Sequence, residues 1–487
     1  MKQLKDILYK VSVDAIYGDT SVPVFQVVFD SREVAKGDLF IAQRGVTVDG
    51  HKFIDKAIEL GVSSIICEDL PENIKEGITY VQVADASHAL AIVAANFYDN
   101  PSSKLNLVGV TGTNGKTTIA SLLYQLFFKA GYKTGLLSTV KVIVDQAEFP
   151  ATHTTPDSVS INRYLNEMVE AGCDYCFMEV SSHGIHQKRS EGLIFAGGVF
   201  TNLSHDHLDY HKTFAEYRDV KKSFFDSIPK SGFVITNIDD KNGNFMVQNT
   251  KAKIRTYALK TLADYKAKII EKRFSGTLLN IDGTEVWTKL IGTFNAYNLL
   301  AIIGTAFELG LDKLEVLTII SKLESVSGRF QYVVSDSGVT AIVDYAHTPD
   351  ALKNVLETIN DIRTDNENLI TVVGCGGDRD KTKRPKMAHI SSQLSNQVIF
   401  TSDNPRSEDP EVILEEMEAG VSPENFKKTL IILDRRQAIK TACKLSKNGD
   451  ILLIAGKGHE TYQEVKGERT HFDDLEEVTN FFQLLKK

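Results

Sequence analysis

The feature that most constrains this chain is residues 108–118, which read Val-Gly-Val-Thr-Gly-Thr-Asn-Gly-Lys-Thr-Thr. An apolar, strand-like stretch, 105–110, precedes it, and a helical apolar pattern follows it. Glycines let backbone N–H groups approach phosphate oxygens, Lys116 can reach terminal phosphates, and the Thr117 hydroxyl can bind magnesium. Val110 stands where the strict pattern has its first glycine. The sequence therefore favours a strand, phosphate loop and helix over an ordinary strand–turn–helix.

Length and composition predict a soluble α/β protein of about three domains. The chain has 487 residues, of which 42% are hydrophobic and 24% charged. It contains no apolar run of about 18 residues, so we expect no membrane span. The first residues lack a signal peptide's apolar core, which predicts a cytoplasmic protein. A net charge of −9 makes nucleic acid a poor partner, although local basic groups can still bind anions.

Five cysteines in so long a chain do not predict a disulfide framework. Cys173 and Cys176 form a single Cys-x-x-Cys pair within a strand-like segment, 173–180. Without a second pair nearby, we expect buried core thiols rather than a metal or redox site. Free thiols agree with a reducing cytosol.

Alternating strand and helix signals divide the chain into residues 1–103, 104–328 and 329–487. In the first part, strands are expected at 24–29, 63–67 and 80–83, helices at 51–60 and 87–98, and a linker at 100–103. In the second, strands are expected at 197–202 and 233–238, a hairpin at 278–289 and a helix at 299–309. The third part has the parallel, Rossmann-like pattern, with strands at 340–343, 369–373, 397–400, 430–433 and 451–455 and helices at 349–362 and 410–418.

Polar residues follow two strands that could flank the phosphate loop. Glu179 ends one strand, and His207 follows another. Ligand groups in open parallel sheets collect at the carboxyl ends of strands. With Thr117, these side chains would give oxygen and nitrogen ligands for magnesium.

Four loops at strand ends in the last part are rich in charged residues. They are residues 344–349, 374–381, 402–406 and 456–460. A solvated loop would explain one such cluster, but four at one edge of a sheet indicate a pocket for a charged ligand.

Taken together in chain order, these motifs resemble the Mur ligase family, the ATP-dependent amide-forming enzymes of peptidoglycan precursor synthesis. The resemblance covers essentially the whole chain. It implies a UDP-MurNAc-binding domain at 1–103, a central ATP-binding domain at 104–328 and a Rossmann-like amino-acid-binding domain at 329–487. It also implies a monomer whose partners are small molecules. The residues expected to bind ATP are Gly112, Thr113, Asn114, Gly115, Lys116, Thr117, Thr118, Asn295, Asn298, Arg329 and Asp344.

The resemblance further implies residues for the other substrates and the metal. The pattern His-x5-Tyr-x3-Lys maps a carbamylated, magnesium-binding lysine to Lys221, with Lys222 as the adjacent alternative. The catalytic residues would be Lys116, Lys221, His207 and Glu179, and the metal ligands Thr117, Glu179, His207 and Lys221. UDP-MurNAc-L-Ala-D-Glu would contact Ser31, His153, Thr154, Thr155, Ser181, Gln187 and Arg189, with His153 where many relatives carry Asn.

The run Asp403-Asn404-Pro405-Arg406 matches family members that add meso-diaminopimelate, whereas lysine-adding relatives usually lack the arginine. A guanidinium fork suits the second carboxylate of meso-diaminopimelate and would repel the ammonium of lysine. A simple turn before a helix is the alternative explanation of this run. The implied set for this substrate is Arg379, Asp403, Asn404, Pro405, Arg406, Gly456 and Glu460.

The expected reaction is an ATP-dependent ligation through an acyl phosphate, with Mg²⁺ as cofactor. A lysine-adding ligase and a folylpolyglutamate synthetase are alternatives within the same chemistry. A regulatory nucleotide switch is an alternative from another class, but the chain lacks the guanine-reading Asn-Lys-x-Asp and has Thr236-Asn237-Ile238-Asp239 instead.

Overall fold

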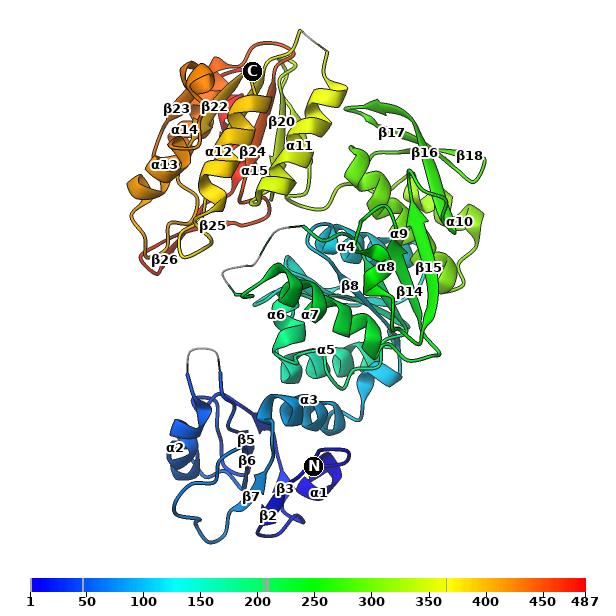
Figure 1. Ribbon diagram of the computed structural model, residues 1–487, viewed down its shortest axis with the longest axis vertical. Helices are drawn as coiled ribbons and strands as arrows, with labels where there is room; N and C mark the ends of the chain where they lie inside the picture. The colour runs from blue at the N-terminus through cyan, green and yellow to red at the C-terminus, as the bar shows by residue number, and fades with distance from the viewer. Residues whose placement is uncertain (1, 46–47, 205, 207–209, 365) are drawn as a thin grey trace.

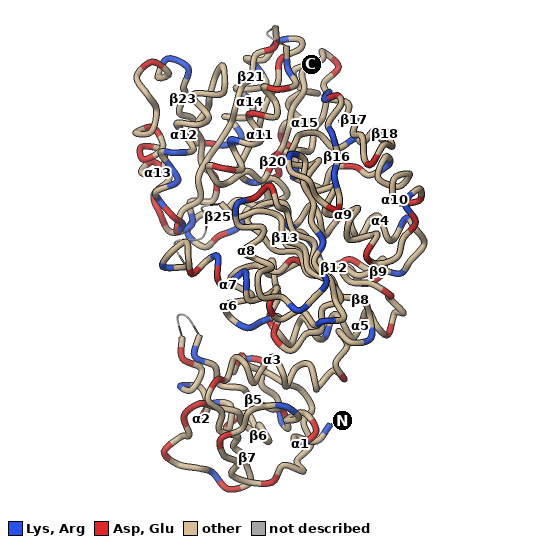
Figure 2. Tube along the Cα trace, turned by 45° about the vertical axis from the view of Figure 1, so that its right-hand side comes forward, with Lys and Arg blue, Asp and Glu red and all other residues tan. Residues whose placement is uncertain are grey.

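The computed structural model describes residues 2–45, 48–204, 206, 210–364 and 366–487. The fold is mixed α/β, built on three main sheets that follow one another along the long axis of the molecule (Figure 1). The N-terminal sheet lies at one end, the sheet with the phosphate loop in the middle, and the C-terminal sheet at the other end. Both signs of charge are distributed over all three parts (Figure 2).

The N-terminal sheet has the order β2-β7-β6-β5-β4, in which β4 to β7 are parallel and β2 is antiparallel. Helix α3 and helix α1 supply buried side chains on one face, and α2 covers the other. Its elements are β1 (Lys2–Gln3), α1 (Leu4–Ile7), β2 (Ala15–Tyr17), β3 (Pro23–Val24), β4 (Val27–Val28), β5 (Leu39–Ile41), η1 (Gly50–Phe53), α2 (Ile54–Glu59), β6 (Ser64–Cys67), β7 (Thr79–Gln82), α3 (Ala86–Phe97) and η2 (Pro101–Ser103).

The central sheet has eleven strands in the order β11-β10-β9-β12-β8-β13-β14-β15-β16-β17-β18. In the middle of this order, the strands β9-β12-β8-β13-β14-β15-β16 are parallel to their neighbours. Antiparallel hairpins extend the sheet at both edges. The strands are β8 (Asn106–Thr111), β9 (Thr134–Leu137), β10 (Lys141–Val144), β11 (Ala147–Pro150), β12 (Tyr175–Glu179), β13 (Gly197–Phe200), β14 (Phe233–Asn237), β15 (Lys253–Ala258), β16 (Tyr265–Arg273), β17 (Gly276–Ile281) and β18 (Thr284–Thr288).

Helices cover both faces of the central sheet because its strands are apolar on both sides. Side chains of α4, α9 and α10 form the core on one face, and those of α5 and α7 form the core on the other. Gly109 in β8 leaves room for this packing, since a Cβ there would lie 2.6 Å from Phe224. The helices are α4 (Lys116–Lys129), α5 (Ser158–Glu170), α6 (Ser182–His186), α7 (Phe214–Ser227), α8 (Gly243–Met246), α9 (Thr293–Glu308) and α10 (Lys313–Ile320).

The C-terminal sheet has the order β19-β20-β24-β21-β22-β23 and is parallel except for β19. Helices α11, α12 and α13 pack on one face, and α14 and α15 on the other. The elements are β19 (Gln331–Val334), β20 (Thr340–Asp344), α11 (Pro349–Ile362), β21 (Leu369–Val373), α12 (Lys383–Leu394), β22 (Gln397–Phe400), α13 (Pro410–Glu418), η3 (Pro423–Lys428), β23 (Thr429–Ile431), α14 (Arg435–Leu445), β24 (Ile451–Ala455), β25 (Tyr462–Val465), β26 (Glu468–His471) and α15 (Asp474–Leu484).

Most expected elements are present, and three differ. The strand expected at 24–29 is split into β3 and β4, which join different sheets. The expected linker 100–103 contains the helical turn η2, which begins after Asn100 in the left-handed conformation. Helix α9 starts six residues before the expected 299, because Gly292 ends the preceding chain with a positive φ of 98°. The five cysteines are buried and free, as expected.

Within the described residues, no helix is long and apolar enough to cross a membrane.

A buried ion pair joins the starts of two helices that pack on the same face of the C-terminal sheet. Arg435 of α14 donates from Nε and Nη2 to the Asp474 carboxylate of α15 at 2.8 and 2.7 Å, and both side chains are 0% exposed. Removing one partner leaves the other as an uncompensated buried charge. We therefore expect Arg435→Met to lower the free energy of unfolding by about 3–5 kcal/mol, measured by urea denaturation.

The next residue provides the control. Arg436 pairs with Glu477 but is half exposed, so Arg436→Met should cost no more than about 1 kcal/mol. Equal losses in the two variants would contradict this assignment.

Candidate active site

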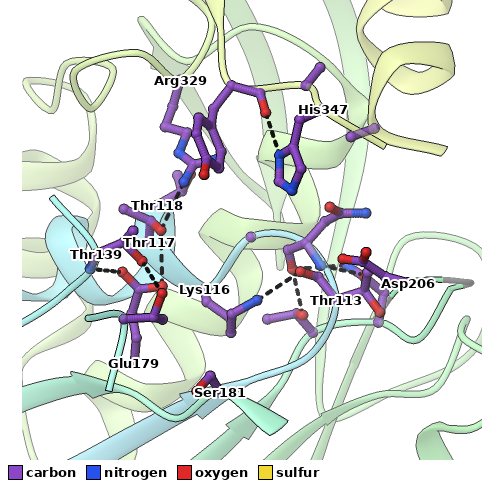
Figure 3. A pocket seen from close by; sticks show the side chains of 18 of the residues that line it. Thr113, Lys116, Thr117, Thr118, Thr139, Glu179, Ser181, Asp206, Arg329 and His347 are labelled. Carbon is purple, nitrogen blue, oxygen red and sulfur yellow. Dashed lines mark hydrogen bonds between the residues drawn. The ribbon is translucent and has the colours of Figure 1, made fainter. Parts of the chain in front are cut away.

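A cavity of about 1230 Å³ lies between the central and C-terminal parts of the chain. The phosphate loop lines it from one side and the loops after β20, β21, β22 and β24 line it from the other. Figure 3 shows Arg329 and His347 reaching into this space opposite Lys116, Thr117 and Glu179. Because β12, β8 and β13 are adjacent parallel strands, the loops that follow them meet at one edge, as the sequence predicted.

The phosphate loop, residues 112–115, requires glycine at two positions. Gly112 has a φ of 146°, and a Cβ there would lie 1.9 Å from the Thr201 hydroxyl. Gly115 has a φ of 89°, and a Cβ there would lie 2.7 Å from Asn298 Oδ1. Helix α4 begins at the next residue, so its N-terminus points into the cavity and provides backbone donors and a favourable dipole for an anion.

Lys116 is folded back onto its own loop. Its Nζ donates to the carbonyl oxygens of Gly112 and Thr113 at 3.0 and 2.8 Å. Burial lowers the pKa of Lys116, and the Glu179 carboxylate opposes that shift. A phosphate in the loop would offer this ammonium a charged acceptor in place of two neutral ones.

Glu179 connects three elements at the base of the cavity. Its Oε2 accepts a hydrogen bond from Thr117 Oγ1 at 2.9 Å, and its Oε1 accepts one from the backbone of Thr139 at 2.7 Å. From the C-terminal side, Arg329 Nη2 donates to the same Thr117 hydroxyl at 3.1 Å (Figure 3). Thr117 and Glu179 thus place two oxygen donors side by side, which suits a hard divalent cation.

Lys221 and Lys222 have different surroundings, although they are adjacent on α7. Lys221 is 1% exposed and donates to the Gly112 carbonyl at 2.9 Å. Burial, together with the nearby Lys116 ammonium, lowers the pKa of Lys221 well below its ordinary value. Lys222 points elsewhere and pairs with Asp226 at 2.7 Å. Of these two adjacent lysines, Lys221 is therefore the one that lines the cavity.

Arg329 and Asp344 lie together at the start of the C-terminal part. The Arg329 guanidinium stacks 4.4 Å from the centre of the Tyr345 ring. Asp344 Oδ2 accepts from the backbone of Phe330 at 2.7 Å. Burial raises the pKa of Asp344 to about 6, although Arg329 opposes the shift.

The residues expected to bind the sugar-linked acid are mostly gathered below the phosphate loop. Thr155 Oγ1 donates to the Glu179 carbonyl at 2.9 Å and accepts from the Ser181 backbone at 2.9 Å. Arg189 holds Gln187 and the Thr155 carbonyl. His153 and Thr154 also line the cavity, whereas Ser31 is buried in the N-terminal part and does not line it.

Arg406 lies on the cavity wall in the left-handed conformation, with a φ of 52°. The hairpin of β25 and β26 holds it there: its N–H donates to the Glu464 carbonyl at 3.1 Å, and its own carbonyl accepts from Lys466 at 2.7 Å. Arg379 and Glu460 line the same wall. Three charged groups, two of them guanidinium groups, thus face one end of the cavity.

The other residues expected in this group lie behind that wall. Asp403 and Asn404 are 7% and 2% exposed, and they, Pro405 and Gly456 do not line the cavity. Asp403 and Asn404 instead surround the buried ammonium of Lys457.

Asn295 and Gly112, both expected to bind ATP, do not line the cavity. Asn295 is buried in the first turn of α9, where it donates to the Ile291 carbonyl at 2.8 Å and accepts from Asn298 at 3.0 Å. Asn295 therefore orients Asn298, and Asn298 is the residue of this pair that lines the cavity. His207 lies outside the described residues.

Several cavity residues were not predicted from the sequence. Asp350 of α11 accepts from Asn114 Nδ2 at 3.2 Å across the two parts of the chain. Tyr345, His347 and His459 lie in loops that were identified from the sequence as rich in charged residues. These three side chains were not themselves predicted to line a site. Tyr462 and Arg469 lie on the hairpin of β25 and β26, which has no motif that would have indicated it.

Comparison with known proteins agrees with this architecture. The model of the Mur ligase family, catalytic domain, matches residues 24–98, that of the Mur ligase middle domain matches 110–306, and that of the Mur ligase, glutamate ligase domain, matches 328–458. A protein of Cytophaga hutchinsonii named UDP-N-acetylmuramoyl-L-alanyl-D-glutamate--2,6-diaminopimelate ligase is 57% identical over 473 residues, 97% of each chain. A Bacteroides fragilis protein of the same name is 52% identical and covers 99% of each chain.

Among solved structures, one of a UDP-N-acetylmuramoyl-L-alanyl-D-glutamate--2,6-diaminopimelate ligase aligns with a TM-score of 0.70 at 32% identity, covering 100% of this chain and 99% of that one. Sequence and fold therefore agree over the full length, and the chain belongs to the Mur ligase family.

Proposed function

We infer that this protein is an ATP-dependent ligase that joins an amine of meso-diaminopimelate to the γ-carboxylate of D-Glu in UDP-MurNAc-L-Ala-D-Glu. Full-length relatives with that name support the inference. The observation that carries it is a single cavity with a phosphate loop on one wall and Arg379, Arg406 and Glu460 on another. A regulatory switch and a folylpolyglutamate synthetase would not need this combination.

The reaction needs ATP because a carboxylate is a poor electrophile. A γ-carboxylate oxygen attacks the γ-phosphorus of ATP, ADP leaves, and an acyl phosphate forms. The amine of meso-diaminopimelate then attacks the acyl carbon, loses a proton, and expels inorganic phosphate. The products are ADP, phosphate and the UDP-linked tripeptide, which belongs to peptidoglycan synthesis.

The phosphate loop and the positively charged side chains of Lys116 and Arg329 act on the transferring phosphoryl group. Backbone N–H groups at the start of α4 and the Lys116 ammonium stabilise its negative charge. Arg329 approaches from the C-terminal part, so the site is complete only when both parts are close together. Asn298 and Asp344 would contact the nucleotide, with Asn295 holding Asn298 in place.

Magnesium is proposed as the cofactor because the oxygens of Thr117 and Glu179 fit it. When bound, the ion would screen the repulsion between the two anionic substrates. Lys221 could join these ligands only after its amine takes up CO₂, which converts a cation into an anionic oxygen donor. The lowered pKa of Lys221 favours this, since only the neutral amine attacks CO₂.

The three parts of the chain would divide the substrates, with UDP-MurNAc held by residues 1–103, ATP by 104–328 and the amino acid by 329–487. We propose that the protein works as a monomer in the cytoplasm. All three of its proposed substrates are water-soluble. Ser31 would then reach the UDP-sugar from outside the cavity.

The activity is tested by omitting one substrate at a time. With ATP, UDP-MurNAc-L-Ala-D-Glu and meso-diaminopimelate together, we expect phosphate release matched by UDP-tripeptide, measured by a phosphate assay and mass spectrometry. A rate of phosphate release that does not depend on either co-substrate would favour a simple NTPase. Equal incorporation of L-lysine in a competition would contradict the choice of meso-diaminopimelate.

Arg406 is expected to recognise the second carboxylate of meso-diaminopimelate. Arg406→Ala keeps the Cβ at this positive φ but removes the guanidinium fork. Loss of such a charged contact should raise the KM for meso-diaminopimelate about ten- to a hundredfold. The KM for ATP should stay unchanged, and equal increases in both would contradict the assignment.

Carbamylation of Lys221 is tested by ¹³C NMR in ¹³C-bicarbonate. We expect one carbamate signal in the wild type and in Lys222→Met, and none in Lys221→Met. A signal that disappears with Lys222 instead would overturn the choice between the two lysines.

A further inference from the structure

Lys457 is a fully buried lysine directly behind the wall that carries Glu460. Gly456 and Gly458 flank it with φ values of 117° and 55°. A Cβ at Gly458 would lie 2.6 Å from Tyr345, so a larger residue would not fit at this turn. The two glycines direct Lys457 inward, while Glu460, three residues later, lines the cavity.

The Lys457 ammonium fixes the orientation of Asn404. Asn404 Oδ1 accepts from Lys457 Nζ at 2.9 Å and from the backbone of Glu464 at 2.9 Å. With two donors on its oxygen, the amide must direct its nitrogen the other way, and Nδ2 donates to Glu460 Oε2 at 2.7 Å. Lys457 Nζ also lies 3.5 Å from the same Oε2. Among the described residues, the side-chain hydrogen bonds to the Glu460 carboxylate therefore converge on Oε2, and Glu460 is the member of this group that lines the cavity.

Lys457 lies between two carboxylates whose negative charges are compensated to different degrees. Its Nζ is 3.3 Å from Asp403 and 3.5 Å from Glu460, and the positive charges of Arg435 and Arg406 also act on Asp403. Burial acts to raise the pKa of Asp403, but Lys457, Arg435 and Arg406 together outweigh it and leave that pKa lowered. Burial and the Asp403 carboxylate raise the pKa of Glu460. Glu460 is therefore the less compensated of the two carboxylates, and it is the one that lines the cavity.

We propose that Lys457 is a positioning residue for the amino acid substrate: it holds Asn404 and Glu460 so that one Glu460 oxygen receives the substrate's non-reacting ammonium. The substrate ammonium would add a positive charge beside Glu460, the less compensated carboxylate. Arg379 and Arg406, on the same wall, take carboxylates. This assignment rests on the proposed function, because it presumes an amino acid with a second ammonium group.

Steady-state kinetics of Lys457→Met test the assignment. The variant should raise the KM for meso-diaminopimelate about tenfold or more, because Glu460 loses its orientation and Asn404 is free to rotate. The KM values for ATP and UDP-MurNAc-L-Ala-D-Glu should change by less than about twofold. Lys222→Met, which removes another buried lysine outside the cavity wall, should leave all three KM values unchanged.

A double-mutant cycle with Glu460→Gln separates positioning from general stability. If Lys457 acts through Glu460, the KM increase in Lys457→Met/Glu460→Gln should be close to that of Glu460→Gln alone. Multiplied effects, an equal rise in all three KM values, or an unchanged KM for meso-diaminopimelate would overturn the proposal.

If Lys457→Met does not fold, Lys457→Arg carries the test. It keeps the positive charge but replaces the point contact with a planar fork, so a selective rise in the KM for meso-diaminopimelate is still expected. An unchanged value would overturn the assignment. Failure of the wild type to form UDP-tripeptide would instead contradict the proposed function itself.

Discussion

The structure depends on the alignment of parallel strands, because parallel pairing places successive loops at one edge of a sheet. The central sheet uses this edge at β12, β8 and β13, and the C-terminal sheet uses it at β20, β24, β21 and β22. The two edges face each other across the cavity, so residues far apart in the sequence meet there. Arg329 and Thr117, which are 212 residues apart, form one hydrogen bond as a result.

The sequence was informative wherever one residue type is required by local geometry. Gly112 and Gly115 are needed at positive φ, and Glu179 ends a strand beside them, so both features could be predicted together with the family resemblance. Their proposed roles in catalysis remain predictions. Helix starts were harder: α9 includes Asn295 and Asn298 in its first turns because Gly292 provides the break, which the apolar pattern alone did not indicate.

What could not be predicted are contacts that depend on the tertiary arrangement. Asp403 and Asn404 are in the expected loop, yet they face inward to Lys457, since the turn at Gly456 brings that lysine beneath them. The contribution of the β25–β26 hairpin was also missed, because its hydrogen bonds to Arg406 are made by backbone groups, which side-chain identity does not reveal.

Two buried lysines illustrate how surroundings decide chemistry. Lys457 lies among two carboxylates and an amide, whose oxygens are within reach of its Nζ. The hydrogen-bond acceptors of Lys221 in the described part of the chain are a carbonyl and a hydroxyl, and a second lysine is nearby, so its charged form is disfavoured. The same residue type is thus suited to positioning in one place and to covalent modification in the other.

The turn after β24 also connects the two ends of the cavity. Gly328 has a φ of 65°, and a Cβ there would lie 2.1 Å from the backbone nitrogen of His459. The Gly328 carbonyl accepts from Tyr345 at 2.9 Å, and the Tyr345 ring lies against both Arg329 and His459. Arg329, which reaches the phosphate loop, is therefore braced by the turn that carries Lys457 and Glu460. Gly328 and Tyr345 thus link this turn at one end of the cavity to Arg329 at the other through close-packed contacts.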